Sequence, residues 1–232
     1  MNIKHAMVLA AGLGRRMKPI TLKTPKPLLE INNISLLERA INLLINHGVQ
    51  EISINVHFLP DKIKSFINKK KFNAKISISN ESDLLLDTGG GVLRGTKNFG
   101  DNPFIVINPD TIWSKNYLDE LKKLELIYFK NKKPVLLLVN KKLSVDPSFN
   151  GDFNLKDEII TKDDENHFIF TGLQITNRSF LVEEKSQIFS MNKIWNALIK
   201  TRNLNGLESN QKFFHLNTFE MYKKILSFNI TD

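Results

Sequence analysis

The sequence contains no cysteine, and this absence excludes a disulfide framework and any metal site built on thiolates. No apolar run approaches the ~20 residues that a membrane-spanning helix needs, so no membrane partner is predicted. The chain reaches its first strand-like run at residues 6–10, too soon for a secretory signal peptide. Low-complexity tracts are also missing. We therefore expect a single domain over residues 1–232, located in the cytoplasm.

The positive charge of the chain lacks the arrangement of a nucleic-acid-binding surface. The formal net charge is +9, but the lysines are scattered along predicted helix faces and loops. Aromatic residues are not interleaved with them in a base-reading pattern. This distribution favours a solvated surface and predicts no nucleic-acid partner. The excess charge is suited to attracting anionic small molecules.

The most informative stretch is residues 9–28, LAAGLGRRMKPITLKTPKPL, which follows the apolar run 6–10. That run predicts a buried parallel strand, and Gly12 and Gly14 after it let the backbone approach a ligand closely. Five cations then follow without a carboxylate: Arg15, Arg16, Lys18, Lys23 and Lys26. A glycine turn after a first strand, followed by cations, predicts a polyphosphate site. The prolines favour an ordered loop over a continuous helix.

Two better-known glycine motifs do not fit this stretch. The dinucleotide fingerprint G-x-G-x-x-G is broken because Met17 stands in place of the third glycine. A Walker A loop is absent as well. A lone G-x-G pair is weak evidence for a ligand, so the wider string of residues has to carry the interpretation.

Apolar periodicity beyond the loop predicts strands that alternate with helices, as in βαβ units with a mainly parallel sheet. The predicted helices are 35–47, 61–70, 116–129, 192–202 and 219–228. The predicted strands are 51–56, 74–79, 103–108, 134–139, 168–175, 206–208 and 212–216, with a hairpin of 151–153 and 159–161 near a polar turn at 163–166. Residues 89–91, three glycines before an apolar helical segment, again predict close approach of backbone to a ligand.

Asp110 is the candidate metal ligand, because it follows the buried strand 103–108. Ligands of open α/β sheets bind at the carboxyl ends of strands, and Mg²⁺ takes one or two carboxylates together with substrate phosphates. The alternative is that Asp110 caps the helix predicted at 116–129.

The string 9–28 resembles the signature of the sugar-1-phosphate nucleotidyltransferases, L-A-A-G-x-G-x-R-hydrophobic-x-P-hydrophobic-T-x-x-x-P-K-P-hydrophobic, and matches every fixed position. The resemblance implies a Rossmann-like three-layer α/β fold with a mostly parallel central sheet and a small β-rich sugar-binding region. The nucleotide-binding half is then about 1–139, and the sugar-phosphate-binding half about 140–232. The implied partners are an NTP and a sugar 1-phosphate, and the implied cofactor is Mg²⁺. A homo-oligomer stays open.

The resemblance also implies a set of site residues. The nucleotide-binding residues are Leu9, Ala10, Ala11, Gly12, Gly14 and Arg15, together with Thr88, Gly89 and Gly90 of the family's L-x-T-x-G segment over base and ribose. The substrate-binding residues are Asn108, Gly151, Asp152 and Gly172. The catalytic residues are Arg16 for the leaving pyrophosphate, Lys26 for the α-phosphate or sugar phosphate, and Asp110 for the metal. No general base is required, since a phosphate nucleophile with a second pKa of about 6 is already anionic.

The chain departs from the family pattern at two places. Pro109 replaces the usual glycine before Asp110. In the family's W-x-D-hydrophobic-G-T segment, His215 replaces the second metal carboxylate and Asn217 the glycine. His215 is therefore either a nitrogen ligand for a softer ion, a protonated group that offsets phosphate charge, or a hydrogen-bond partner of a phosphate beside a metal held by Asp110 alone.

Within the family, the glycine triplet, Gly151-Asp152-Phe153 and the segment F-S-x-N-x-x-W resemble the uridylyltransferases that act on N-acetylmuramate 1-phosphate. This resemblance implies UTP as the donor and a role in cell wall recycling. The alternatives are a mannose-1-phosphate guanylyltransferase, a glucose-1-phosphate uridylyl- or thymidylyltransferase, and a homologue that binds nucleotide without catalysis.

Overall fold

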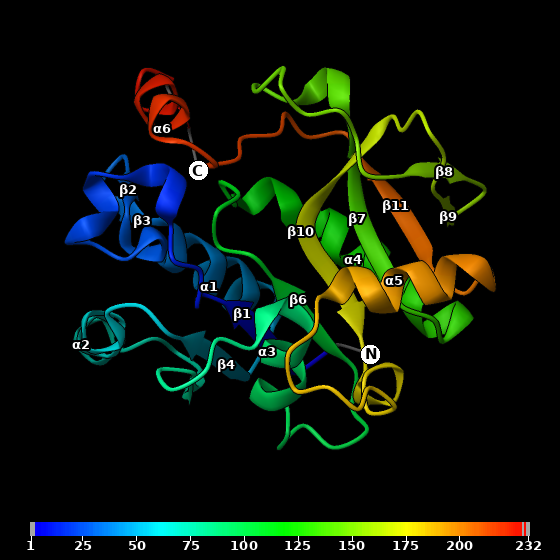
Figure 1. The fold of residues 1–232 in the computed structure, drawn as a ribbon, viewed down its shortest axis with the longest axis horizontal. Helices are drawn as coiled ribbons and strands as arrows, with labels where there is room; N and C mark the ends of the chain where they lie inside the picture. The colour runs from blue at the N-terminus through cyan, green and yellow to red at the C-terminus, as the bar shows by residue number, and fades with distance from the viewer. Residues whose placement is uncertain (1–2, 229, 231–232) are drawn as a thin grey trace.

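The computed structural model describes residues 3–228 and 230, and a nine-stranded sheet in the order β5-β4-β1-β6-β10-β7-β11-β9-β8 crosses this part of the chain (Figure 1). The strands are β1 His5–Leu9, β4 Glu51–Val56, β5 Lys75–Asn80, β6 Phe104–Ile107, β7 Val135–Asn140, β8 Asn154–Lys156, β9 Ile159–Thr161, β10 Phe168–Thr176 and β11 Asn205–Ser209. A separate pair is formed by β2 Glu30–Ile31 and β3 Ile34–Ser35. The helices are α1 Leu36–His47, α2 Pro60–Lys70, α3 Asp87–Gly95, α4 Leu118–Asn131, α5 Met191–Lys200 and α6 Phe219–Leu226.

The direction of the strands gathers their carboxyl ends at one edge. Neighbours β5, β4, β1 and β6 are all parallel, and β11 is parallel to β7. Strand β10 is antiparallel to both β6 and β7, between which it lies. The sheet is therefore mixed but mostly parallel, as predicted. The segments after β1 and β6 leave it side by side, which places the glycine loop next to Asp110.

Two apolar cores, one on each face of the sheet, make the fold three-layered. Successive side chains of a strand point to opposite faces. Val8 and Ile105 accordingly join the core that includes residues of α1 and α4, whereas Met7 and Phe104 join the core that includes residues of α3 and α5. In Figure 1, α3 and α5 lie in front of the sheet, and α1 and α4 lie behind it. Among the described residues, no helix combines the length and apolar character needed to cross a bilayer.

Two predictions for the second half of the chain are wrong. The strand β9 pairs with β8 rather than with 151–153, and the hairpin turns at Asp157 and Glu158, whose φ angles are 51° and 62°. Consecutive residues with positive φ are the geometry that two-residue hairpin loops need. The polar stretch 163–166 instead joins β9 to β10. Residues 212–216 form isolated bridges, Phe213 with Ser144 and His215 with Thr111, rather than a strand.

The glycine triplet has close neighbours within the chain itself, which the sequence did not predict. Gly89, Gly90 and Gly91 lie inside α3 and are buried against other parts of the chain. A Cβ at Gly90 would lie 2.1 Å from the carbonyl oxygen of Gln187, and one at Gly89 would lie 2.4 Å from the ring of Phe189. The close approach that these two glycines permit is thus made by the segment 187–189. A nucleotide contact by Gly89 and Gly90 stays a prediction.

Candidate active site

The loop after β1 is folded by three short 3₁₀ turns, Arg15–Met17, Ile20–Leu22 and Lys26–Leu28. Gly14 adopts a left-handed conformation with φ of 59°, which favours glycine. Its carbonyl oxygen accepts hydrogen bonds from Met17 N–H at 2.9 Å and from the Thr21 hydroxyl at 2.9 Å. The predicted ordered loop is confirmed, and three of its five cations, Arg15, Arg16 and Lys26, line one cavity, whereas Lys18 and Lys23 do not.

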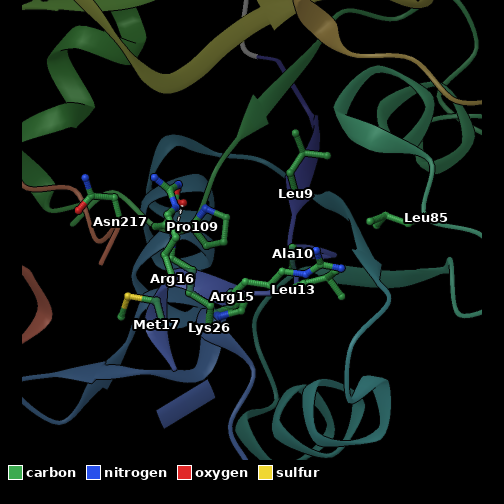
Figure 2. A pocket seen from close by; sticks show the side chains of 14 residues that line it. Leu9, Ala10, Leu13, Arg15, Arg16, Met17, Lys26, Leu85, Pro109 and Asn217 are labelled. Atoms are coloured by element: carbon green, nitrogen blue, oxygen red, sulfur yellow. Dashed lines mark hydrogen bonds and ion pairs between the residues drawn. The ribbon is translucent and has the colours of Figure 1, made fainter. Parts of the chain in front are cut away.

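That cavity, the phosphate cavity, has a volume of about 560 Å³ and is lined mainly by this loop. Its lining residues are Leu9, Ala10, Gly12, Leu13, Gly14, Arg15, Arg16, Met17, Lys26, Pro27, Leu85, Pro109, Asp110 and Asn217. Figure 2 shows Asn217 and Leu85 at opposite sides, with Arg16 and Lys26 between them. A Cβ added at Gly12 would meet nothing within 4 Å, so the space beside this glycine is open to a ligand. Three cations around open space fit a polyphosphate.

Lys26 and Asp110, predicted separately from the loop and from the strand end, are brought together here. The Lys26 ammonium donates a hydrogen bond to Oδ2 of Asp110 at 2.5 Å. Burial raises the pKa of the Asp110 carboxyl, but the charge and hydrogen bond of Lys26 outweigh burial and lower this pKa to about 2. Asp110 is therefore ionised at neutral pH.

The alternative role of Asp110 as a helix cap is wrong. Helix α4 begins at Leu118, after a 3₁₀ turn whose N-cap is Ser114, so Asp110 lies outside its first turn. The second carboxylate oxygen, Oδ1, is buried and has no hydrogen-bond partner among the described residues. A buried carboxylate oxygen without a partner fits a cation ligand, because leaving it unsatisfied is costly.

His215 lies beside this carboxylate, with its Nε2 atom 3.8 Å from Oδ2 of Asp110. The backbone fixes this placement, because Leu216 N–H donates to the Asp110 carbonyl at 2.8 Å and Ile112 N–H donates to the Phe214 carbonyl at 2.9 Å. Burial lowers the pKa of His215, and the opposing charge of Asp110 does not reverse that direction. With its pKa lowered, the His215 imidazole is neutral at neutral pH, which disfavours the predicted role of a protonated group that offsets phosphate charge.

The hydrogen bonds of His215 assign the position of its proton. The Thr111 hydroxyl donates to the Thr171 carbonyl at 2.6 Å, so its oxygen is left to accept from Nδ1 of His215, 3.4 Å away. In this tautomer Nδ1 carries the proton and Nε2 has a free lone pair facing Asp110. Such a nitrogen cannot donate to a phosphate oxygen, but it can bind a metal ion. Imidazole suits first-row transition ions better than Mg²⁺, so the fit to Mg²⁺ rests on Asp110.

Asn217 is a lining residue whose role the sequence did not reveal. Its side-chain NH₂ donates to Oδ2 of Asp146 at 2.6 Å, and the other carboxylate oxygen of Asp146 accepts from Ser148 N–H at 2.9 Å. The amide is therefore fixed in one orientation at the edge of the phosphate cavity. The signal in the sequence was its position two residues after His215, where the family pattern has glycine.

A second cavity of about 470 Å³ adjoins the first. We call it the neutral-end cavity, because none of its lining residues is a lysine or arginine that could bind the charged phosphates of a ligand. It shares Leu9, Gly12, Leu85 and Asp110 with the phosphate cavity, and its other lining residues are Ala11, Asn55, Glu81, Asp87, Thr88, Asn108 and Ile188. It carries carboxylates in place of the cations of the first cavity. Thr88 and Asn108 thus line one cavity, and their contacts with nucleotide and substrate stay predictions.

Asn55 and Glu81 were missed by the sequence analysis. The Asn55 side chain accepts from Ala10 N–H at 2.7 Å and donates to Oε1 of Glu81 at 2.8 Å, and both side chains are buried. Glu81 also accepts from Leu86 N–H at 3.2 Å. This chain of hydrogen bonds ties the loop after β1 to the residues before α3. Asn55 pairs with Leu9 in the register of β4 and β1. Its position near the carboxyl end of a predicted strand was therefore a signal in the sequence that it lies at the site.

The other predicted sugar-side residues have partners within the protein. Gly172 has φ of 93°, and its carbonyl oxygen accepts from Asn108 N–H at 2.8 Å. Gly151 has φ of 88° and lies against the Asn166 carbonyl. The Asp152 carboxylate accepts from Phe170 N–H at 2.9 Å. None of Gly151, Asp152 and Gly172 lines either cavity described above, so their contact with substrate stays a prediction.

A glycine loop after the first strand, cations around open space and a carboxylate at the end of a parallel neighbouring strand define an α/β nucleotide-binding protein. The family model described as nucleotidyl transferase matches residues 5–139, and the chain belongs to this family.

Named relatives are consistent with that family, and a solved structure shares the fold. The chain is 36% identical over 113 residues to an N-acetylmuramate alpha-1-phosphate uridylyltransferase of Caulobacter vibrioides, over 47% of each protein. It is 37% identical over 111 residues to a mannose-1-phosphate guanyltransferase of Aspergillus oryzae, over 46% of this chain and 30% of that protein. The match therefore spans half or less of the length of these curated relatives. A UDP-glucose pyrophosphorylase complexed with UDP-glucose has the same fold, with a TM-score of 0.78, 18% identity and 97% of each chain covered.

Proposed function

We propose that the protein transfers a nucleotidyl group from an NTP, with UTP as the favoured donor, to a sugar 1-phosphate, with N-acetylmuramate 1-phosphate as the favoured acceptor. The observation that carries this proposal is the Lys26–Asp110 pair at the meeting point of a cationic cavity and a neutral-end cavity. Family membership and the names of the relatives support the reaction class.

The reaction needs charge neutralisation rather than a proton shuttle. An oxygen of the sugar 1-phosphate forms a bond to the α-phosphorus of the NTP. The bond from that phosphorus to the α,β-bridging oxygen breaks, and its electron pair leaves with pyrophosphate. The nucleophile is already an anion, so alignment and stabilisation of developing charge are the tasks left to the protein.

The site divides these tasks among three side chains. Arg16, exposed at the wall of the phosphate cavity, binds the leaving pyrophosphate. Lys26 leaves Asp110 and neutralises the α-phosphate or the sugar phosphate. Asp110, with its unpartnered Oδ1, holds the divalent cation. When bound, Mg²⁺ supplies Lewis-acid stabilisation of the phosphoryl oxygens.

The half of the chain after residue 139 provides the sugar side in this proposal. Asn108 lines the neutral-end cavity and is fixed to Gly172, so β10 positions it. Gly151 and Asp152 complete the predicted sugar-phosphate site from the loop that pairs with the start of β10.

The test is a grid of UTP, GTP, dTTP, CTP and ATP against sugar 1-phosphates, with pyrophosphate release as the readout. We expect the highest rate with UTP and N-acetylmuramate 1-phosphate. A highest rate with GTP and mannose 1-phosphate would instead establish the second candidate, which the Aspergillus relative supports. A flat grid with retained nucleotide binding would contradict catalysis and favour a nucleotide-binding homologue.

A further inference from the structure

The neutral-end cavity has an apolar rim that the catalytic proposal does not use. Leu85 and Ile188 both line this cavity, and they are 37% and 50% exposed. Large apolar side chains at the mouth of a cavity leave apolar surface in water until a ligand covers it. Ile188 comes from the segment between β10 and α5, more than 100 residues from Leu85 along the chain.

The glycines of α3 explain how Ile188 reaches this cavity. The Phe189 carbonyl accepts hydrogen bonds from Gly89 N–H at 2.8 Å and from Gly90 N–H at 3.1 Å. Phe189 N–H donates to the Leu86 carbonyl at 3.3 Å. Figure 1 shows the segment before α5 passing beside α3. Because Gly89 and Gly90 have no side chains, the segment 187–190 packs directly against the backbone of α3, and any Cβ at Gly90 would displace Gln187.

The two neighbouring residues of this segment have opposite environments. Phe189 is only 5% exposed and anchors the segment in the core with α5, whereas Ile188 stays half-exposed at the cavity. The Thr88 hydroxyl accepts from Met191 N–H at 2.9 Å and fixes the far end of the segment. The segment is thus held at Phe189 and again at Met191, directly after Ile188, which fixes the backbone that carries Ile188 at the cavity wall.

The charges of the two cavities determine which part of a ligand lies against Ile188. The phosphate cavity carries Arg15, Arg16 and Lys26, whereas the neutral-end cavity carries the carboxylates of Glu81 and Asp87. Phosphates are repelled from the second cavity and attracted to the first. A ligand that spans both must be anionic at one end and uncharged with an apolar face at the other, as an NTP is.

We propose that Ile188, seated on the glycine face of α3, is a nucleoside-contact residue that packs with Leu85 against the base and ribose of the NTP. This inference rests on the proposed function, but it is tested by binding alone. Losing the burial of one isoleucine side chain corresponds to about tenfold or more in affinity.

The experiment measures binding of UTP, GTP and inorganic tripolyphosphate by calorimetry, without any turnover. In Ile188→Ser, we expect the tighter-binding NTP to lose about tenfold in affinity, while tripolyphosphate binding is unchanged. The matched control is Val182→Ser, because Val182 is 55% exposed in the same connection and does not line the cavity. It should leave both affinities unchanged.

Gly90→Ala supplies a second, supporting variant, since its Cβ would meet the Gln187 carbonyl and move the segment that carries Ile188. With folding confirmed by the thermal midpoint, it should reproduce the selective loss of NTP affinity. Unchanged NTP affinity in Ile188→Ser, or equal losses for NTP and tripolyphosphate, would overturn the inference. A raised KM for the sugar 1-phosphate with normal NTP affinity would overturn it as well, by assigning the wall to the sugar. Failure of the proposed reaction would leave these binding differences in place.

Discussion

The two halves of the chain build their shares of the site differently. In residues 5–139, Arg16 and Lys26 lie on one loop, and Asp110 follows the strand next to it. In the second half, Asn217 lines the same cavity and His215 approaches the Asp110 carboxylate, both from a segment that is held by isolated bridges. The first half uses a regular parallel sheet edge, whereas the second relies on single backbone contacts.

The two halves therefore differ in how firmly the backbone fixes the positions of their site residues. Parallel neighbours fix the distance between their carboxyl ends, so the pairing of β1 with β6 places the start of the loop beside Asp110, and the turns of the loop then bring Lys26 to it. A bridge of one residue fixes its own position but constrains little around it. We therefore expect substitutions in the first half to have the larger effects on catalysis.

The largest effect is expected for Asp110→Asn. This variant should abolish Mg²⁺-dependent turnover, beyond the roughly 10³-fold cost of losing one charge-stabilising contact, because Asp110 is the sole carboxylate that lines the phosphate cavity among the residues the structure describes. Initial rates are measured across a Mg²⁺ titration, with Asp119→Asn, 80% exposed on α4, as the control. Full restoration of the rate by added Mg²⁺ would contradict the assignment of Asp110 as the metal ligand.

Lys26→Ala and Arg16→Ala should each lower turnover by roughly 10²–10³-fold, as for the loss of one contact made in the transition state. The reason is that each removes one of the cations around the phosphates. Steady-state rates are compared with those of Lys64→Ala, a lysine of α2 outside the cavity. A folded Lys26→Ala variant with a near-normal rate would show that the loop has another role.

Substitutions of His215 should have a smaller effect, roughly 10–100-fold, and should alter metal preference. Because Nε2 has a free lone pair facing Asp110, the wild type should favour Mn²⁺ over Mg²⁺, and His215→Asp should shift the preference toward Mg²⁺. His215→Ala should lower the rate and lose the preference. Direct metal binding is followed by calorimetry, and rates by pyrophosphate release. Identical metal affinities in wild type and His215→Ala would place His215 outside the metal site.

The smallest effect is expected on stability in acid. The pKa of Asp110 is lowered to about 2, so its ion pair contributes fully above the ordinary value near 4 and is lost as the pH falls through 2. The difference in thermal midpoint between wild type and Asp110→Asn should therefore decline by a few degrees between pH 4 and pH 2. Thermal unfolding at several pH values measures it. A difference that stays constant over this range would contradict the lowered pKa.

The sequence predicted regular elements well where periodicity and packing agree. The strand at 51–56 and the helix beginning near residue 36 have clear patterns and caps, including the Ser35 side chain that accepts from Glu38 N–H at 3.1 Å. The site residues of the contiguous loop were found for the same reason. Local sequence determines such a loop, because its turns close on their own hydrogen bonds.

Features that depend on distant contacts were missed or misinterpreted. The packing of Gly89 and Gly90 against the segment 187–189 was missed because that segment is about 100 residues away along the chain. The hairpin was misplaced because Asp157 and Glu158 lack the glycine typical of such turns. Asn55 and Glu81 carry no motif, and only the pairing of β4 with β1 brings Asn55 to the site.

The position of β10 has a consequence for any attempt to divide the protein. The family model ends at residue 139, which suggests a place to cut, yet β10 at 168–176 is hydrogen-bonded on both sides, to β6 and to β7. A fragment that stops at 139 would leave β6 and β7 without their hydrogen-bonding partner and expose the apolar side chains that β10 covers. Unpaired strand edges pair with other chains. Expressed alone, the matched region should aggregate, and its solubility should return when a peptide carrying β10 is supplied in trans.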